Sequence, residues 1–330
     1  MSDDAKGLNR RNLMMATGAL LTAGMAGLSQ ARAADGPAMT LPRAWTEAEV
    51  LHLWPDGPPE SGYKAEALPD DWPGTFIRNV AEPTLHVFRP AKPNGGALLV
   101  MPGGAYWFVS IQNEGVDVAN AMTQLGYTVF VLVYRLPGEG WTQRTNVPLQ
   151  DAQRAMRLIR AHSSDYQCDP HHVAALGFSA GGHLAASLTT NFGETVYEAR
   201  DAVDRQDARP FASGLIYPVI SMQEPVTHAQ SANLLLGPEP SQALVAHRSP
   251  AQHVSGDTPP VFLMHALDDP AVPPRNSLLM MEALREAGRP VEAHFFEEGG
   301  HGFGLGAPEL PAHQWISLYE AWLDRHIRKS

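Results

Sequence analysis

The stretch Val173-Ala174-Ala175-Leu176-Gly177-Phe178-Ser179-Ala180-Gly181-Gly182-His183-Leu184-Ala185-Ala186 decides the fold of this chain. A short apolar run leads into Gly-Phe-Ser-Ala-Gly, and small, helix-forming residues follow, so the pattern predicts a strand, a tight turn and a helix. Gly-x-Ser-x-Gly sequences also occur by chance, but this context is typical of a sharp turn that exposes a nucleophilic serine. Gly177 and Gly181 suit such a turn because a Cβ atom there would crowd the neighbouring chain. We therefore predict that Ser179 is a nucleophile.

A second glycine-rich loop precedes this turn. Residues 97–101 form a continuous apolar run, which is typical of a strand buried on both faces. The run continues into Pro102-Gly103-Gly104-Ala105-Tyr106-Trp107. A lean loop at the end of a central strand lets backbone N–H groups approach a substrate oxygen, and ahead of a nucleophile turn it supplies half of an oxyanion hole.

Strand and helix patterns alternate along the chain. The predicted strands are residues 84–88, 97–101, 127–134, 173–178, 214–218, 261–265 and 291–296. The predicted helices, besides the one that follows Ser179, are residues 113–125, 149–159 and 275–287 and a last one that begins at residue 311. This alternation predicts an α/β fold with a mostly parallel central sheet flanked by helices.

Two segments lie outside this alternation. Residues 34–75 are rich in Pro, Gly and Trp and show no periodicity, so we expect an extended N-terminal arm packed on a domain at residues 76–330. Trp45, Trp54 and Trp72 are candidate packing anchors, with stacking on sugar rings as the alternative. Residues 219–258 contain several prolines and no strand pattern, and we expect them to form a small lid-like excursion over the active site.

Composition excludes several classes of function. The chain has 330 residues and a formal net charge of -11, so nucleic acid is not an expected partner. The one cysteine, Cys168, has no partner for an internal disulfide and is predicted to be a buried thiol. The sequence has no His-Glu-x-x-His and no tight Cys/His cluster, and His171-His172 lacks a third ligand, so we predict no metal site and no cofactor.

The first 33 residues have the features of an export signal. Residues 9–15 carry an arginine pair, an uncharged run rich in Ala, Gly and Leu follows, and Ala31-Arg32-Ala33 is a small-x-small cleavage sequence. The arginine pair indicates a twin-arginine signal, so we expect the twin-arginine machinery of a bacterium to export the protein to the periplasm or medium. The run is too short and glycine-rich to predict a membrane anchor. The alternative to an export signal is an amphipathic or disordered tail.

A serine nucleophile needs a base and a group that orients the base. In α/β-hydrolases the acid and then the histidine follow the serine in the sequence, each after a late strand. His301 lies in Glu298-Gly299-Gly300-His301-Gly302-Phe303-Gly304, where the glycines keep the loop lean, and it is the predicted base. His183 is expected only to pack or bond locally and His265 to be structural, and either Asp268 or Asp269 could be the acid.

Several motifs together resemble the α/β-hydrolase esterases of the acetylxylan-esterase-like type. They are Pro-Gly-Gly-Ala-Tyr, Tyr-Arg-Leu-Pro, Pro-Leu-Gln-Asp-Ala-Gln-Arg-Ala, Gly-Phe-Ser-Ala-Gly-Gly-His-Leu-Ala, Tyr-Pro-Val-Ile-Ser-Met and Gly-Gly-His-Gly-Phe-Gly. The resemblance implies that the acid is Asp269, the one that stands three residues before the valine of Val-Pro. It also implies oxyanion donors on Ala180 and on Gly104 or Ala105. The family usually has a third glycine where this chain has Ala105.

The resemblance, taken with export, implies an esterase that hydrolyses small acetyl esters or acetylated plant polysaccharides such as xylan or pectin. The implied mechanism is two-step acyl transfer by Ser179, His301 and Asp269. The alternatives are an arylformamidase-like hydrolase, a small-molecule carboxylesterase, a peptidase of the prolyl-oligopeptidase type and a non-catalytic carbohydrate-binding protein on the same scaffold. Glycosidase chemistry needs two facing carboxylates, and the sequence nominates no such pair.

Overall fold

The computed structural model describes residues 41–328, so the predicted signal at residues 1–33 lies outside the described residues. An eight-stranded sheet has the order β1-β3-β6-β4-β7-β8-β9-β10. Its strands are β1 (Glu49–His52), β3 (Thr84–Phe88), β6 (Thr128–Val133), β4 (Ala97–Met101), β7 (Val173–Phe178), β8 (Ser213–Ile216), β9 (Val261–Ala266) and β10 (Val291–Phe296). All neighbours from β6 to β10 are parallel, whereas β3 pairs antiparallel with both β1 and β6. The prediction of a mostly parallel sheet is confirmed.

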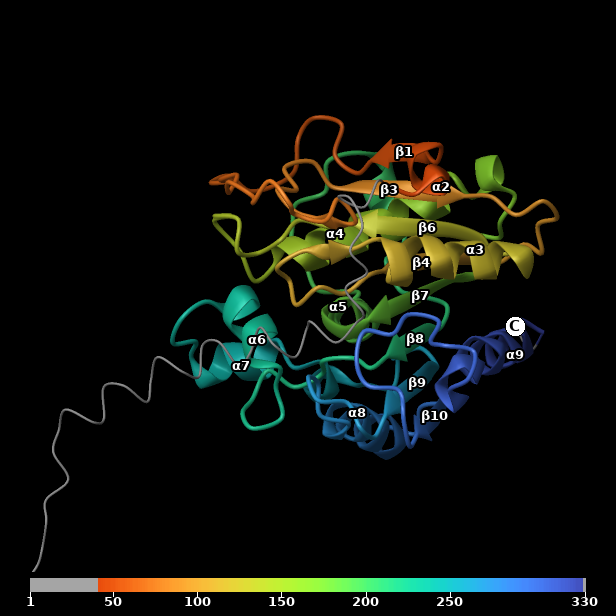
Figure 1. The fold of residues 1–330 in the computed structure, drawn as a ribbon. Helices are drawn as coiled ribbons and strands as arrows, with labels where there is room; N and C mark the ends of the chain where they lie inside the picture. Colours follow the sequence, from red (N-terminus) through yellow and green to blue (C-terminus); the bar gives the residue numbers. More distant parts are fainter. Residues whose placement is uncertain (1–40, 329–330) are drawn as a thin grey trace, which may run out of the picture. The chain divides into compact units, whose positions relative to one another are not determined.

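Helices pack against this sheet, as Figure 1 shows. The longer ones are α3 (Asp117–Gln124), α4 (Val147–Ala161), α5 (Ser179–Thr190), α8 (Arg275–Glu286) and α9 (Trp315–Ile327). Helix α3 contacts β3 and β6, α4 and α5 contact β7, and α8 and α9 contact β9. The central strands β4, β6 and β7 are buried along their whole length, as their continuous apolar runs predict. Parallel strands bring the loops that follow them to one edge of the sheet.

The predicted helix at residues 113–125 begins differently from a regular α-helix. Residues Gln112–Val116 form a π-helix, η2, in which the Val116 N–H donates to the carbonyl of Ile111, and α3 follows it. The π-helix directs Glu114 inward, and this residue is 3% exposed. Leu125, the last residue of the predicted helix, lies just after α3 ends and is 44% exposed.

The arm contains regular elements that its sequence pattern does not show. It contains the short helix α2 (Arg43–Thr46) and strand β1, which pairs with β3 at the edge of the sheet. Three of the four β1 residues are exposed, so the strand has no apolar alternation that a sequence pattern could reveal. The predicted anchors Trp45 and Trp54 are buried, and Trp72 is half-buried.

A buried ion pair connects the arm to the sheet and to α4. The guanidinium of Arg135, from Tyr-Arg-Leu-Pro, donates to both oxygens of Asp151, and both side chains are fully buried. Trp54 donates its indole N–H to Asp151 at 2.8 Å, and Arg135 also donates to the carbonyl of Pro59 at 2.6 Å. Two of the motifs that carry the resemblance therefore fasten the arm.

The excursion at residues 219–258 is helical. It contains α6 (Ala229–Leu236), α7 (Gln242–His247) and the 3-10 turn η5 (Pro250–His253), and Figure 1 draws α6 and α7 together, apart from the helices that cover the sheet. Within residues 41–328, no helix combines the length and apolar character that a membrane crossing requires.

Candidate active site

The turn between β7 and α5 holds Ser179 in a strained conformation. Its φ is +52°, in the left-handed region that non-glycine residues avoid. A Cβ on Gly177 would lie 2.3 Å from the carbonyl oxygen of Gly181, and a Cβ on Gly181 would lie 2.1 Å from that of Met101. Both glycines are therefore required for the close packing that sets the serine at the end of the strand.

Three side chains from three different loops meet at this point. Ser179 Oγ lies 2.8 Å from His301 Nε2, and His301 Nδ1 lies 2.6 Å from Asp269 Oδ2. Ser179 follows β7, Asp269 follows β9 and His301 follows β10. The structure thus brings together the serine, acid and histidine that the sequence nominated, at hydrogen-bond distance in the order serine, histidine, acid.

The environment of Asp269 keeps its carboxylate ionised. Burial is the largest influence and raises the pKa, but hydrogen bonds from His265 and His301, the charge of His301 and the N–H of Val272 together hold the pKa at about 2. His265 Nε2 lies 3.2 Å from Asp269 Oδ2, so the predicted structural histidine touches the acid directly. The carboxylate also accepts from the N–H of Ala271 at 2.9 Å. Asp269 is therefore a fixed negative charge beside His301.

Asp268 has a different partner. Its Oδ1 accepts from the N–H of Gly300 at 2.8 Å, and its carboxylate makes no hydrogen bond to His301. It braces the backbone of the loop that carries the histidine. The geometry therefore separates the two aspartates, which the order of elements alone left open.

The loop after β4, residues 102–107 and named here the oxyanion loop, presents free N–H groups beside the serine. The Gly103 N–H is already used, because it donates to Glu114 Oε2 at 2.7 Å. Within the described part of the chain, the N–H groups of Gly104, Ala105 and Ala180 donate to no protein acceptor. These are the predicted oxyanion donors, and the geometry leaves both Gly104 and Ala105 available.

Ala105 carries backbone strain that a glycine would not. Its φ is +57°, where a Cβ costs about 1 kcal/mol or more. We expect Ala105→Gly to raise the free energy of unfolding by about 0.5 to 1 kcal/mol, since the relief of strain exceeds the added freedom of the unfolded chain. Chemical denaturation monitored by tryptophan fluorescence measures this change, and a less stable variant would contradict the account.

His183 bonds to the oxyanion loop, which goes beyond the local packing expected of it. Its Nδ1 lies 2.7 Å from the hydroxyl of Tyr106, and its Nε2 lies 2.8 Å from the carbonyl oxygen of Arg248. The carbonyl accepts from Nε2–H, so Nδ1 accepts from the Tyr106 hydroxyl and the ring is neutral. Tyr106 itself has a φ of +61°, and His183 thus holds a strained residue of the loop in place.

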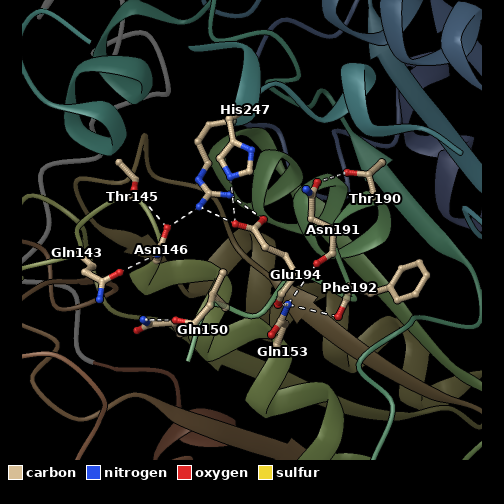
Figure 2. Close-up of polar contacts among 12 residues, drawn as sticks. Gln143, Thr145, Asn146, Gln150, Gln153, Thr190, Asn191, Phe192, Glu194 and His247 are labelled. Atoms are coloured by element: carbon tan, nitrogen blue, oxygen red, sulfur yellow. Dashed lines mark hydrogen bonds and ion pairs between the residues drawn. The ribbon is translucent and has the colours of Figure 1, made fainter. Parts of the chain in front are cut away.

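A polar network around Glu194, drawn in Figure 2, holds Arg248, whose carbonyl accepts from His183. Arg248 donates to both oxygens of Glu194, at 2.9 and 3.1 Å, and to the amide oxygen of Asn146 at the start of α4. His247 Nε2 also lies 3.1 Å from Glu194, and Figure 2 draws this contact as a dashed line. Gln153 of α4 donates to the carbonyl of Glu194 at 2.9 Å. The C-terminal end of the excursion is therefore tied to α4 and, through His183, to the oxyanion loop.

The buried His183 predicts a loss of stability in acid. Burial lowers its pKa from 6.5 to about 4, so below pH 6.5 the unfolded chain binds a proton that the folded protein does not. The contribution of neutral His183 to the free energy of unfolding is present above pH 6.5 and is lost as pH falls towards 4. The loss is about 2 to 3 kcal/mol near pH 4.5. We expect His183→Gln, whose amide can keep both hydrogen bonds, to show a smaller pH dependence of the free energy of unfolding.

Urea denaturation of both proteins near pH 7 and pH 4.5 measures this difference. Burial also lowers the pKa of His86 and of His228 to about 4, but both residues are present in both proteins, so the difference isolates His183. Equal pH dependence in the two proteins would contradict the account.

One residue of the excursion lies near the triad of Ser179, His301 and Asp269. Burial lowers the pKa of His228, and the charges of His301 and Asp269 also act on it. Its Nδ1 lies 2.8 Å from the hydroxyl of Ser231 in α6. A separate cavity of about 430 Å³ lies between residues 222–227, α6 and α7, and no triad residue lines it.

Two buried residues of the site were missed by the sequence analysis. Glu114 and Tyr217 hydrogen-bond to each other at 2.9 Å and lie between the oxyanion loop and the loop of His301. The sequence signal that could have pointed to Glu114 is an acidic residue inside an apolar helical pattern. Among residues 41–328, no group of three or more His, Cys, Asp or Glu side chains is arranged to hold a metal ion.

Comparison with known proteins places this chain in a family. Residues 85–284 match the family model described as BD-FAE. The chain is 33% identical over 223 residues to the acetylxylan esterase of Xylanibacter ruminicola, covering 66% of this chain and 43% of that protein. It is 34% identical over 213 residues to endo-1,4-β-xylanase B of Butyrivibrio fibrisolvens, covering 64% and 33%. The chain therefore spans less than half the length of these two curated relatives.

A solved structure resembles the fold over most of the chain. The acetyl ester-xyloside bifunctional hydrolase of Caldicellulosiruptor lactoaceticus superposes with a TM-score of 0.67 at 38% identity, covering 74% of this chain and 88% of that one. The predicted α/β-hydrolase fold and the resemblance to acetylxylan-esterase-like proteins are thus confirmed.

Proposed function

This chain belongs to the BD-FAE family of α/β-hydrolases, and from this premise we propose that it is an exported serine esterase. Its substrates are short-chain, chiefly acetyl, esters on plant polysaccharides such as xylan or pectin. The observation that carries the proposal is the hydrogen-bonded series Ser179, His301 and Asp269, with distances of 2.8 and 2.6 Å, beside unpaired N–H groups. This is the arrangement that acyl transfer by serine requires.

The proposed reaction has two steps. In the first, His301 Nε2 takes the proton of Ser179 as its Oγ attacks the ester carbonyl, and the oxyanion binds to the N–H of Ala180 and of Gly104 or Ala105. The intermediate collapses, His301 gives its proton to the departing alcohol oxygen, and an acyl-serine remains. In the second step His301 takes a proton from water, the hydroxide attacks the acyl-serine, and the acid leaves as Ser179 regains its proton. Asp269 holds the Nδ1–H tautomer and stabilises the imidazolium in both steps.

The substrate part of the proposal rests on two kinds of support. The similar proteins named above include an acetylxylan esterase and an acetyl ester-xyloside hydrolase. The arginine pair and cleavage sequence in residues 1–33 support export through the twin-arginine machinery, which would bring the enzyme to polymeric substrates outside the cell.

Acetate release from acetylated xylan tests this substrate. The protein that begins at residue 34 is expected to release acetate, and Ser179→Ala is expected to release none above the blank. An aryl acetate in the same plate is the control for general esterase activity. Serine-dependent cleavage of the aryl acetate without release from xylan would contradict the polysaccharide and keep the esterase. No cleavage of either would contradict both, and an N-formyl aryl amide then tests the formamidase alternative.

A further inference from the structure

A buried carboxylate that the proposed reaction does not use lies behind the oxyanion loop. Glu114, in the π-helix η2, is 3% exposed. Its Oε2 accepts from the N–H of Gly103 at 2.7 Å, and its Oε1 accepts from the hydroxyl of Tyr217 at 2.9 Å. A Cβ on Gly103 would lie 2.9 Å from both Glu114 Oε2 and the Ser179 Cβ, so this contact is immediately beside the nucleophile. The carboxylate therefore fixes the first glycine of the oxyanion loop.

Tyr217 continues this contact to the loop of His301. It follows β8 with a φ of +36°, it is fully buried, and its hydroxyl accepts from the N–H of Gly304 at 2.9 Å. Its ring also packs against the His301 ring, with centroids 5.0 Å apart. A single series of hydrogen bonds thus runs from Gly103 through Glu114 and Tyr217 to Gly304, and it joins the loops after β4, β8 and β10.

The pattern of donors fits an ionised Glu114. The Tyr217 oxygen already accepts from Gly304, so its own proton goes to Glu114 Oε1, and the second carboxylate oxygen receives the N–H of Gly103. A protonated Glu114 would leave one of these buried hydrogens without an acceptor. Burial raises the pKa of Glu114, and the bonds from Gly103 and Tyr217 and the positive charge of His301 offset only part of that rise. The hydroxyl of Tyr134 is a further titratable group near Glu114, because burial and then the charge of Glu114 raise the pKa of Tyr134.

We propose that Glu114 is a positioning residue, which holds the oxyanion loop and the histidine loop in register and whose negative charge stabilises the protonated His301. The inference rests on the proposed function, because protonated His301 forms during acyl transfer. Asp269 contacts His301 directly, whereas Glu114 bonds to Tyr217 and acts on His301 from a greater distance. The site therefore contains two carboxylates with different roles.

The test is the pH dependence of aryl acetate hydrolysis by Glu114→Gln. The glutamine has nearly the shape of glutamate but no charge, and its NH₂ cannot accept from one of the two donors. We expect kcat to fall about ten- to a hundred-fold, with KM changed less, because misplacement of the loops affects the transition state most. We expect the acid limb of kcat/KM to move to lower pH by about half a unit or more, since protonated His301 loses a stabilising charge.

The other groups that face His301 are unchanged in this variant. They are Asp269, which bonds to Nδ1, His228 of the excursion, whose pKa is lowered by burial and then by the charge of His301, and the ring of Tyr217. An acid limb that stays at the wild-type pH would overturn the electrostatic part of the proposal. A wild-type kcat would overturn the positioning part.

Two matched variants separate charge from shape. Glu114→Asp keeps the charge but is too short to reach both donors, so we expect kcat to fall while the acid limb stays near that of wild type. Tyr134→Phe removes a buried hydroxyl that donates to the carbonyl of Pro102 at 2.7 Å, one residue from Gly103, and leaves every charge in place. Its acid limb is expected to stay at the wild-type pH. An equal shift in Tyr134→Phe would show that any disturbance of this loop moves the limb and would overturn the proposal.

A second route remains if Glu114→Gln does not fold. Tyr217→Phe removes the acceptor of the Gly304 N–H and the donor to Glu114, and we expect its kcat to fall at least about tenfold at unchanged KM. A wild-type kcat in Tyr217→Phe would overturn the inference. Wild-type enzyme that is inactive on aryl acetate, or active without Ser179, would instead contradict the proposed function, so the two failures are distinguishable.

Discussion

Ser179→Ala is expected to lower kcat for an aryl acetate by about 10⁵- to 10⁶-fold, to a residual rate that the remaining groups support. The reason is geometric. Ser179 Oγ is the atom 2.8 Å from His301 Nε2, and no other hydroxyl forms a hydrogen bond to that nitrogen in the described part of the chain. Steady-state hydrolysis at saturating ester measures the loss.

The variant is not expected to unfold. Alanine keeps the Cβ and the buried environment, and it removes one hydroxyl that is 2.8 Å from His301. Ser179→Gly is the matched control, since it removes the Cβ at a φ of +52° and is expected to be more stable than Ser179→Ala by about 1 kcal/mol. Both variants should be inactive. Loss of structure in Ser179→Ala, or turnover like that of wild type, would contradict the role given to the serine.

Asp269→Asn is expected to lower kcat by about 10⁴-fold. The Asp269 oxygen 2.6 Å from His301 Nδ1 holds the proton on Nδ1 and leaves Nε2 free to act as a base. An asparagine amide can donate to Nδ1 instead, which would place the proton on Nε2 and prevent it from accepting the proton of Ser179. Because His265 also lies 3.2 Å from the same oxygen, the substitution disturbs two histidines.

Asp268→Asn is the matched control for this prediction. Its Oδ1 accepts from the Gly300 N–H, and an asparagine oxygen can do the same, so we expect less than about a tenfold change in kcat. Steady-state kinetics on both variants, with thermal unfolding to compare their stability, makes the comparison. A large loss in Asp268→Asn together with a small loss in Asp269→Asn would reverse the assignment.

The parts of the site that the sequence predicts are those with a local chemical reason. Ser179 is marked by the glycines at 177 and 181, because a Cβ on either residue would clash with the backbone. His301 is marked by its glycine-rich loop after the last strand. The pair Asp268 and Asp269 could not be resolved from the order of elements, because both follow β9 and only side-chain direction separates them.

Other features depend on distant contacts that no local pattern carries. Glu114 bonds to a residue 11 positions away and to another 103 positions away, so its role depends on how the loops meet. His183 likewise bonds to Arg248, 65 positions away, and its position four residues after the serine indicates only local packing. Three of the four residues of β1 are exposed, and it is a strand because β3 offers it an edge.

The central claim, that Ser179 is the activated nucleophile of a serine hydrolase, is tested most directly by covalent labelling. The protein that begins at residue 34 is treated with a fluorophosphonate, digested and analysed by peptide mass spectrometry. The account predicts a single modified residue, Ser179, with no labelling of Ser179→Ala and slow labelling of Asp269→Asn. Modification of another residue, or no modification of a folded wild-type protein, would contradict it.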